Sequence, residues 1–201
     1  GADVIILFGV TSATAVALRT AAALGYGTTW GPQFIIGSVG ADPTTLLTLA
    51  RATTAEARTA TLRSLTNAIS LSFLPAATDT EDEYVKKFIE INTKYNAGAA
   101  WDNNVLVGMN QAMLIVQALR AAGKNPTRKS LISALETKGA KFASASYTSN
   151  GVSKSSHAGH TGYWFGKYNQ AGALVPIDAA RTIYTTDSGT GPVSKAKAKR
   201  A

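Results

Sequence analysis

Residues 4–36 read VIILFGVTSATAVALRTAAALGYGTTWGPQFII, and this stretch decides the fold class. It opens with five apolar residues in a row, rich in β-branched side chains, which is typical of a strand covered on both faces. After a short polar loop, apolar residues recur at helical spacing between residues 13 and 24. A second apolar run, Phe34-Ile35-Ile36, follows. Strand, helix and strand within about 35 residues predict a βαβ unit with two parallel strands.

The predicted βαβ unit places two polar loops at one edge of the sheet. Val10, Thr11 and Ser12 follow the first strand, and Ser38 follows the second. Ligands of open α/β sheets bind at the carboxyl ends of the strands, so these four residues are the candidate ligand-binding residues. The hydroxyls of Thr11 and Ser12, with the free N–H groups of a helix start, could hold a carboxylate. A plain helix N-cap explains Ser12 more simply, and turn chemistry explains Ser38 equally well.

Further along the chain, capping residues and apolar spacing predict more helices and strands. Three helices in succession, with no strand between them, distinguish the middle of the chain. A turn-prone stretch at 75–80 separates them from the first part. The predicted elements are helices at 42–52, 81–95, 103–122 and 127–136, strands at 68–74 and 183–184, and a hairpin of 163–165 with 174–175.

Composition excludes several classes of protein. The chain has 201 residues, of which 45% are apolar, so it can bury a core and is neither disordered nor fibrous. No uninterrupted apolar run approaches the roughly 20 residues that cross a bilayer. The absence of cysteine excludes disulfide scaffolds, thiol catalysis and zinc sites built on cysteine.

The positive charge of the chain does not predict a nucleic-acid partner. Four of the positive charges lie in the last seven residues, and removing them lowers the net charge from +8 to +4. The remaining charges are spread along the chain without a stripe, and no aromatic residues interleave with them as a stacking platform requires. We therefore expect no nucleic acid as partner and interpret residues 191–201 as a disordered basic tail.

Motifs for catalysis or cofactor binding are missing from the sequence. His157 and His160 form H-x-x-H, but a metal site would need two further ligands, so packing of a loop explains them better. The sequence contains no G-x-S-x-G elbow, no G-x-G-x-x-G and no P-loop. We therefore expect neither enzymatic activity nor a metal or cofactor.

Several segments, taken in order, carry a resemblance to a known family. They are ADVIIL (2–7) with AAALGY (21–26), DNNV (102–105) leading to QALRAAG (117–123), TRKSLISALE (127–136), SHAG (156–159) and PI (176–177). This ordered set resembles the type I periplasmic solute-binding proteins of ABC importers, in particular the branch that binds leucine, isoleucine and valine. The resemblance covers nearly the whole chain.

The resemblance implies an α/β fold of two lobes, of which this chain is only the C-terminal part. Residues 1–75 would belong to the second lobe, 80–138 would be helices returning to the first lobe, and 140–190 would be closing strands of the second lobe. The implied function is that of an extracytoplasmic receptor, in the periplasm or on the cell surface. It would bind a small solute between the lobes and dock on the membrane permease of an ABC importer.

The resemblance also bears on the solute. Thr11 matches a ligand-facing position of the family. At the position of Ser38, amino-acid binders of the family tend to carry a carboxylate that meets the ammonium group of the ligand. Serine supplies no such charge, so an amide or an organic acid fits nearly as well as a small amino acid.

The first lobe raises a question of completeness. In the family, its sheet comes from an N-terminal stretch that this chain lacks, so the helices between 81 and 136 would present apolar faces with no sheet to cover. Apolar patches of that size are rare on soluble monomers. We therefore expect a missing N-terminal lobe segment or a companion chain as partner. The alternative is a processed or proteolytic fragment that acts, if at all, through protein–protein interaction.

Overall fold

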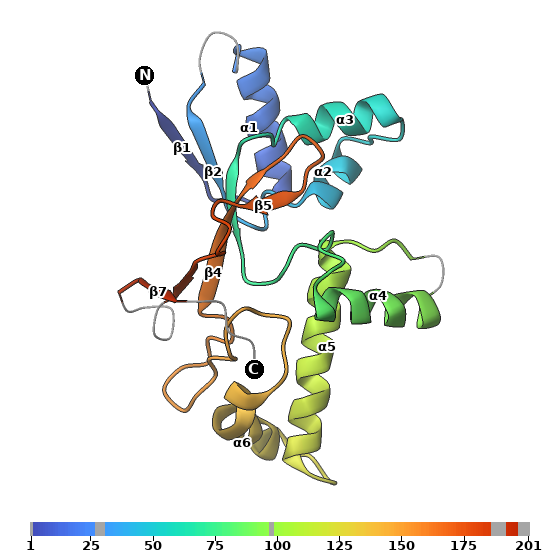
Figure 1. The fold of residues 1–201 in the computed structure, drawn as a ribbon, viewed down its shortest axis with the longest axis vertical. Coiled ribbons are helices and arrows are strands. Elements are labelled where there is room, and N and C mark those ends of the chain that lie inside the picture. The colour runs from blue at the N-terminus through green and yellow to red at the C-terminus, as the bar shows by residue number, and fades with distance from the viewer. Residues whose placement is uncertain (1, 27–30, 97–98, 186–191, 197–201) are drawn as a thin grey trace. The chain divides into compact units, whose positions relative to one another are not determined.

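The computed structural model describes residues 2–26, 31–96, 99–185 and 192–196, and its chain divides into two compact units (Figure 1). Unit 1 comprises Gly1–Ser72 and Phe165–Ala179, and unit 2 comprises Phe73–Trp164 and Ala180–Ala201. The chain therefore passes from one unit to the other three times. Trp30, which the sequence suggests as a packing residue, lies outside the described residues.

Unit 1 is a mostly parallel sheet with helices packed on it, as the α/β prediction requires. Strands β1, β2 and β3 are parallel, and β4 and β5 form an antiparallel hairpin. The turn at residues 169–172 closes this hairpin, as predicted. The elements are β1 (Val4–Leu7), α1 (Thr11–Ala23), β2 (Gln33–Ile36), α2 (Pro43–Leu49), α3 (Ala55–Arg63), β3 (Ile69–Ser72), β4 (Gly162–Tyr168), which begins in unit 2, and β5 (Leu174–Pro176).

The core of unit 1 lies on one face of its sheet. Phe34 and Ile36 of β2 are buried there against Leu18 of α1 and Leu46 of α2. The opposite face of β1 is open, since Val4 is 47% and Ile6 is 60% exposed. The prediction of a strand covered on both faces is therefore wrong for β1. Its apolar run is continuous, but the described helices cover only one side of it.

Unit 2 is built around three helices that begin within two residues of the predicted positions. The Asp82 carboxylate accepts hydrogen bonds from the N–H groups of Tyr84 and Val85, and Asp102 caps the next helix in the same way. Thr127 forms a capping box with Ser130. The elements are α4 (Glu83–Tyr95), α5 (Asn103–Ala122), α6 (Arg128–Lys138), a 3-10 turn η1 (Gly139–Lys141), β6 (Ile183–Thr185) and β7 (Ser194–Ala196).

Two later stretches of the chain are held by contacts within unit 2. Residues 140–164 belong to unit 2, because side chains of α5 bind them: Asn110 accepts from the Ala145 N–H and Gln117 bonds both backbone groups of Ala143. The C-terminal tail is not wholly disordered, because Ser194–Ala196 pairs with β6 as an antiparallel strand. The pairing gives backbone partners to a stretch with no apolar pattern.

Helix α5 is apolar on two sides. Leu106, Leu114 and Ala118 are buried within unit 2, whereas Ile115 and Val116 are exposed. By length and composition alone this helix could cross a membrane, a test that core helices of soluble proteins also pass. Asn110 and Gln111 interrupt its apolar run. The exposed side agrees with the expectation that these helices present apolar faces.

Candidate functional site

The two candidate loops leave neighbouring strands at the same edge of the unit 1 sheet. Leu7 of β1 lies opposite Ile36 of β2, and the Gly37 N–H donates to the Leu7 carbonyl at 3.0 Å. The loop after β1 and the loop after β2 therefore start side by side. Parallel pairing is the cause, because it brings carboxyl ends of strands together.

Thr11 joins these loops directly. Its hydroxyl donates to the Val39 carbonyl at 2.7 Å, and its side chain is only 7% exposed. The hydrogen that the Thr11 hydroxyl could donate to a ligand is therefore already donated to a backbone carbonyl. The other predicted residues, Val10, Ser12 and Ser38, are exposed at the same edge.

The start of α1 differs from the prediction in one respect. Val10, and not Ser12, occupies the N-cap position, and no side chain caps the helix. The N-cap interpretation of Ser12 is therefore wrong, because the helix begins at Thr11 and Ser12 lies in its first turn. As the N-cap residue, Val10 supplies no side-chain acceptor to the N–H groups of this first turn, and such groups attract anionic or carbonyl oxygens.

A close backbone approach behind the loops was not recognised from the sequence. A Cβ atom on Gly40 would lie 2.6 Å from the Thr14 Oγ1 and 2.7 Å from the Gly9 carbonyl oxygen. Only glycine fits there without displacing its neighbours. The presence of glycine in both loops is the sequence feature that could have indicated this approach, but the spacing of Gly9 and Gly40 does not show that the two loops contact each other.

The candidate edge is electrically neutral in its own side chains. Residues 9–12 and 37–41 contain no ionisable group. Asp42 comes next, but its carboxylate caps α2 by accepting from the Thr45 N–H at 2.7 Å. Burial, together with the nearby Asp42 charge, raises the pKa of Tyr168, which keeps that phenol neutral. The edge can therefore offer hydroxyl and N–H groups to a ligand, but no formal charge.

The two histidines do not share one site. The His157 Nε2 lies 3.1 Å from Glu136 Oε1. The ring of His160 stacks on Phe73 with 4.0 Å between ring centroids and lies 3.3 Å from the Ser146 hydroxyl, and its burial lowers its pKa. Within the ranges that the structure describes, no group of three or more histidine or carboxylate side chains could hold a metal ion.

Unit 2 contains a polar cluster that the sequence did not predict, here called the Arg181 cluster. The Arg181 guanidinium donates to the Tyr147 hydroxyl, lies 3.4 Å from an Asp79 carboxylate oxygen and stacks 5.2 Å from the Trp164 ring. Trp164 itself donates to the Leu74 carbonyl at 2.9 Å. Asp79, Trp164 and Arg181 come from the three segments where the chain enters or leaves unit 2, and Tyr147 comes from within it. Asp79 and Arg181 are 102 positions apart, so no local pattern signals their contact.

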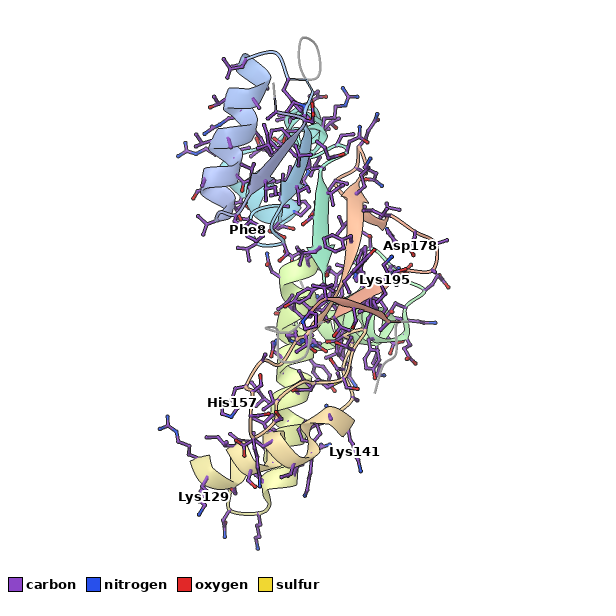
Figure 2. The ribbon with its side chains drawn as sticks, turned by 90° about the vertical axis from the view of Figure 1, so that its left-hand side faces the viewer. Phe8, Lys129, Lys141, His157, Asp178 and Lys195 are labelled. Carbon is purple, nitrogen blue, oxygen red and sulfur yellow. The ribbon has the colours of Figure 1, made fainter. Side chains whose placement is uncertain are left out.

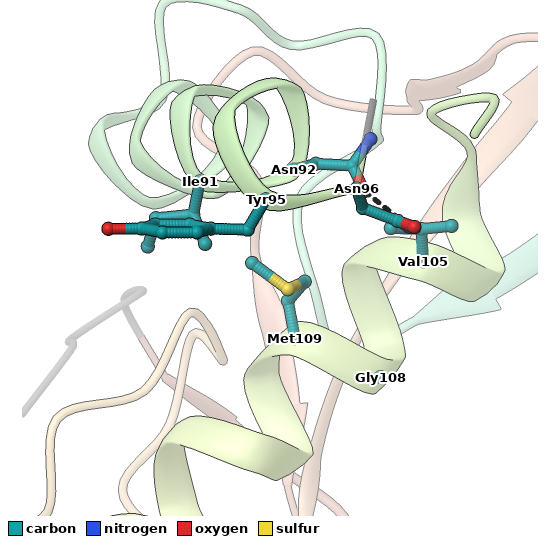
Figure 3. Close-up of a pocket in the computed structure, with 7 residues that line it drawn as sticks. All are labelled: Ile91, Asn92, Tyr95, Asn96, Val105, Gly108 and Met109. Atoms are coloured by element: carbon teal, nitrogen blue, oxygen red, sulfur yellow. Dashed lines mark hydrogen bonds between the residues drawn. The ribbon is translucent and has the colours of Figure 1, made fainter. Parts of the chain in front are cut away.

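An apolar groove of about 310 Å³ lies between α4 and α5 (Figure 3). Its polar members, Asn92 and Asn96, bond to each other through their side-chain amides at 3.2 Å. A small polar solute would find few partners here, so we interpret the groove as part of the exposed apolar side of these helices. The groove is lined by Ile91, Asn92, Tyr95, Asn96, Val105, Gly108 and Met109.

Three solved structures resemble the chain over most of its length. A substrate-binding periplasmic protein from Ralstonia solanacearum is 18% identical with a TM-score of 0.68, and the match covers 87% of this chain and 45% of the Ralstonia chain. A possible leucine/isoleucine/valine-binding protein from Rhodopirellula baltica SH 1 is 16% identical with a TM-score of 0.67, and the match covers 88% of this chain and 42% of the Rhodopirellula chain. A branched chain amino acid ABC transporter from Thermus thermophilus, solved with bound valine, is 18% identical with a TM-score of 0.63. This match covers 94% of this chain and 47% of the Thermus chain. At these identities the likeness shows the fold alone, and the chain spans less than half the length of each.

Family membership rests on a sequence match. A family model described as periplasmic binding protein matches residues 1–173, which include both candidate loops. No curated protein sequence matches the chain. The match and the fold confirm the predicted resemblance, with a type I periplasmic-binding-protein fold of which this chain forms a part. The chain belongs to the periplasmic binding protein family.

Proposed function

We propose that the chain is the solute-binding part of an extracytoplasmic receptor that serves an ABC importer. The observation that carries the proposal is the pair of loops at the carboxyl edge of β1 and β2, joined by the Thr11–Val39 hydrogen bond. This edge holds exposed polar groups in a fixed arrangement and contains no acid–base pair, so it suits binding and not covalent chemistry. The location would be the periplasm or the cell surface.

The chemistry of the edge limits the solute class. The uncapped first turn of α1, with the hydroxyls of Ser12 and Ser38, would bind carbonyl or carboxylate oxygens. No carboxylate of these loops would meet an ammonium group. Small amides and organic acids are therefore favoured, and a small amino acid would need its ammonium partner from the other lobe of the receptor.

The partners follow from the same assignment. A complete receptor would close around its solute and dock on a membrane permease. The exposed side of α5 and the groove beside it would be covered by a missing N-terminal lobe segment or a companion chain. The alternative, a fragment that acts through protein–protein interaction, draws on the same apolar side. Intact mass of native material separates the two, because the receptor hypothesis requires a longer chain or a companion chain and the fragment hypothesis requires neither.

A thermal-shift screen tests solute binding by the chain itself. Acetamide, lactate, glutamine and valine are added in turn, and a binder at ten times its Kd should stabilise the chain by about 1.4 kcal/mol, a rise in Tm of a few degrees. The shift should shrink in Ser38→Ala and persist in Thr59→Ala, a matched loss of an exposed hydroxyl on α3. Absence of a shift for every compound, or an equal loss in both variants, would contradict binding at this edge.

A further inference from the structure

Charge is unevenly distributed within unit 2. Residues 79–102 carry six acidic residues and three lysines, whereas residues 120–141 carry six basic residues and one acidic residue, Glu136. The prediction that the charges outside the C-terminal tail are spread along the chain is therefore wrong within unit 2. The six basic residues, here called the basic cluster, are Arg120, Lys124, Arg128, Lys129, Lys138 and Lys141.

The fold gathers the basic cluster on α6 and the end of α5. Helix α6 packs back on α5, with Leu131 and Leu135 against Leu114 and Ala118. This packing brings the last turn of α5 next to the first turn of α6. Figure 2 shows Lys129 and Lys141 projecting from the two ends of the α6–η1 segment. All six side chains of the cluster are exposed.

The ion pairs of the described residues do not involve the basic cluster. Among the described residues, the ion pairs are Lys87–Glu90, His157–Glu136 and Arg181–Asp79, and none includes a member of the cluster. Glu136, the single acid of the stretch, faces His157, and its side chain is only 18% exposed. Among the described residues, the cluster therefore presents six exposed basic side chains without an ion-pair partner.

Helix stability does not explain these charges. Arg120 and Lys138 lie in the last turns of α5 and α6, where a cation favours the helix dipole. Arg128 and Lys129, however, are the first two residues of α6, where the dipole disfavours a cation. Their placement opposes local stability, which points to a role in binding a polyanion.

The surroundings of the cluster favour one kind of polyanion. Ile132 of α6 is 39% exposed, so an apolar side chain lies among the basic ones, away from the exposed side of α5. Residues 103–141 contain no aromatic side chain that could stack on bases. Basic helices with exposed aliphatic side chains suit the interface of an anionic bilayer. We propose that the basic cluster binds an anionic phospholipid surface.

Vesicle co-sedimentation of the full chain tests the proposal. Binding should occur with vesicles of 30% phosphatidylglycerol in phosphatidylcholine, should be at least tenfold weaker with phosphatidylcholine alone, and should be lost at 0.5 M NaCl. The triple variant R128Q/K129Q/K138Q should weaken partitioning on the order of a hundredfold, about fivefold for each charge. The matched control R19Q/R58Q/R63Q removes three exposed charges from α1 and α3 of unit 1 and should retain most of the binding.

Three outcomes would overturn the proposal. Equal binding to neutral and anionic vesicles would exclude an electrostatic contact, and equal losses in the two triple variants would exclude this cluster as the site. Binding to heparin or to an acidic polypeptide without binding to anionic vesicles would assign the cluster to another class of partner. The test does not depend on solute binding, so it stands or falls separately from the proposed receptor function.

Discussion

Two threonines of α1, one turn apart, offer a sharp test of the loop architecture. Both are buried, but the Thr11 hydroxyl donates to the Val39 carbonyl at 2.7 Å, whereas the Thr14 Oγ1 has no hydrogen-bond partner among the described residues. Valine has nearly the shape of threonine and lacks the hydroxyl. Replacing each threonine by valine therefore removes a hydrogen bond at one position and an unsatisfied polar atom at the other.

The expected effects have opposite signs. Thr11→Val should lower the free energy of unfolding of unit 1 by about 1 kcal/mol, the net value of one hydrogen bond. Thr14→Val should leave it unchanged or raise it by up to about 1 kcal/mol, because burying an unbonded hydroxyl is unfavourable. Helix propensity hardly contributes, since threonine and valine are both β-branched and rank close together.

Native-state hydrogen exchange measures this difference locally. The Gly37 amide, which donates to the Leu7 carbonyl, reports opening of the β1–β2 edge. Its exchange should become about fivefold faster in Thr11→Val and should not accelerate in Thr14→Val. Equal acceleration in the two variants would refute the view that Thr11 joins the loops, and Thr11→Ser, which keeps the hydroxyl, should behave largely like the parent chain.

Three further predictions concern other parts of the molecule. Gly40→Ala should lower the free energy of unfolding by about 1–3 kcal/mol in thermal denaturation, because its Cβ would lie 2.6 Å from the Thr14 Oγ1; a neutral effect would contradict the close approach. Burial lowers the pKa of His160 below the ordinary histidine value of 6.5, so the unfolded chain binds more protons. Stability should therefore fall as pH drops from 7 through 6.5 toward the lower folded-state pKa. In urea titrations between pH 7 and 6, His160→Gln should make the free energy of unfolding less dependent on pH. An unchanged pH dependence would exclude His160 as its source. Arg181→Gln and Asp79→Asn should show a coupling of about 0.5–1 kcal/mol in a double-mutant cycle, because both side chains are partly exposed, and strictly additive losses would contradict the contact.

Local chemistry made much of the fold predictable. The helix starts after Asp82, Asp102 and Thr127 follow from side chains that cap their own neighbours, and these interactions span only a few residues. The βαβ unit follows from periodicities that are complete within residues 4–36. Because the loops after parallel strands necessarily share an edge, the position of Ser12 and Ser38 at one edge was predictable as well.

Features that depend on distant segments were not predictable. Whether β1 is covered on both faces depends on which helices reach it. A strand covered on one face and a strand covered on both can have the same continuous apolar run, so the run does not distinguish them. The contact of Arg181 with Asp79 joins residues from opposite ends of unit 2, and the pairing of β7 rests on backbone groups that every residue has. The inward direction of the Thr11 hydroxyl depends on the path of the loop at Val39, which residue spacing does not specify.

The open side of β1 has a practical consequence for handling the protein. In the described chain β1 pairs only with β2, and Phe8, the residue that follows β1, is 84% exposed. A free, apolar strand edge can template the addition of a strand from another molecule. The net charge of +8 opposes such encounters by mutual repulsion, and salt screens that repulsion. Concentrated samples should therefore stay clear at low ionic strength and become turbid as salt is added, the reverse of ordinary salting-in.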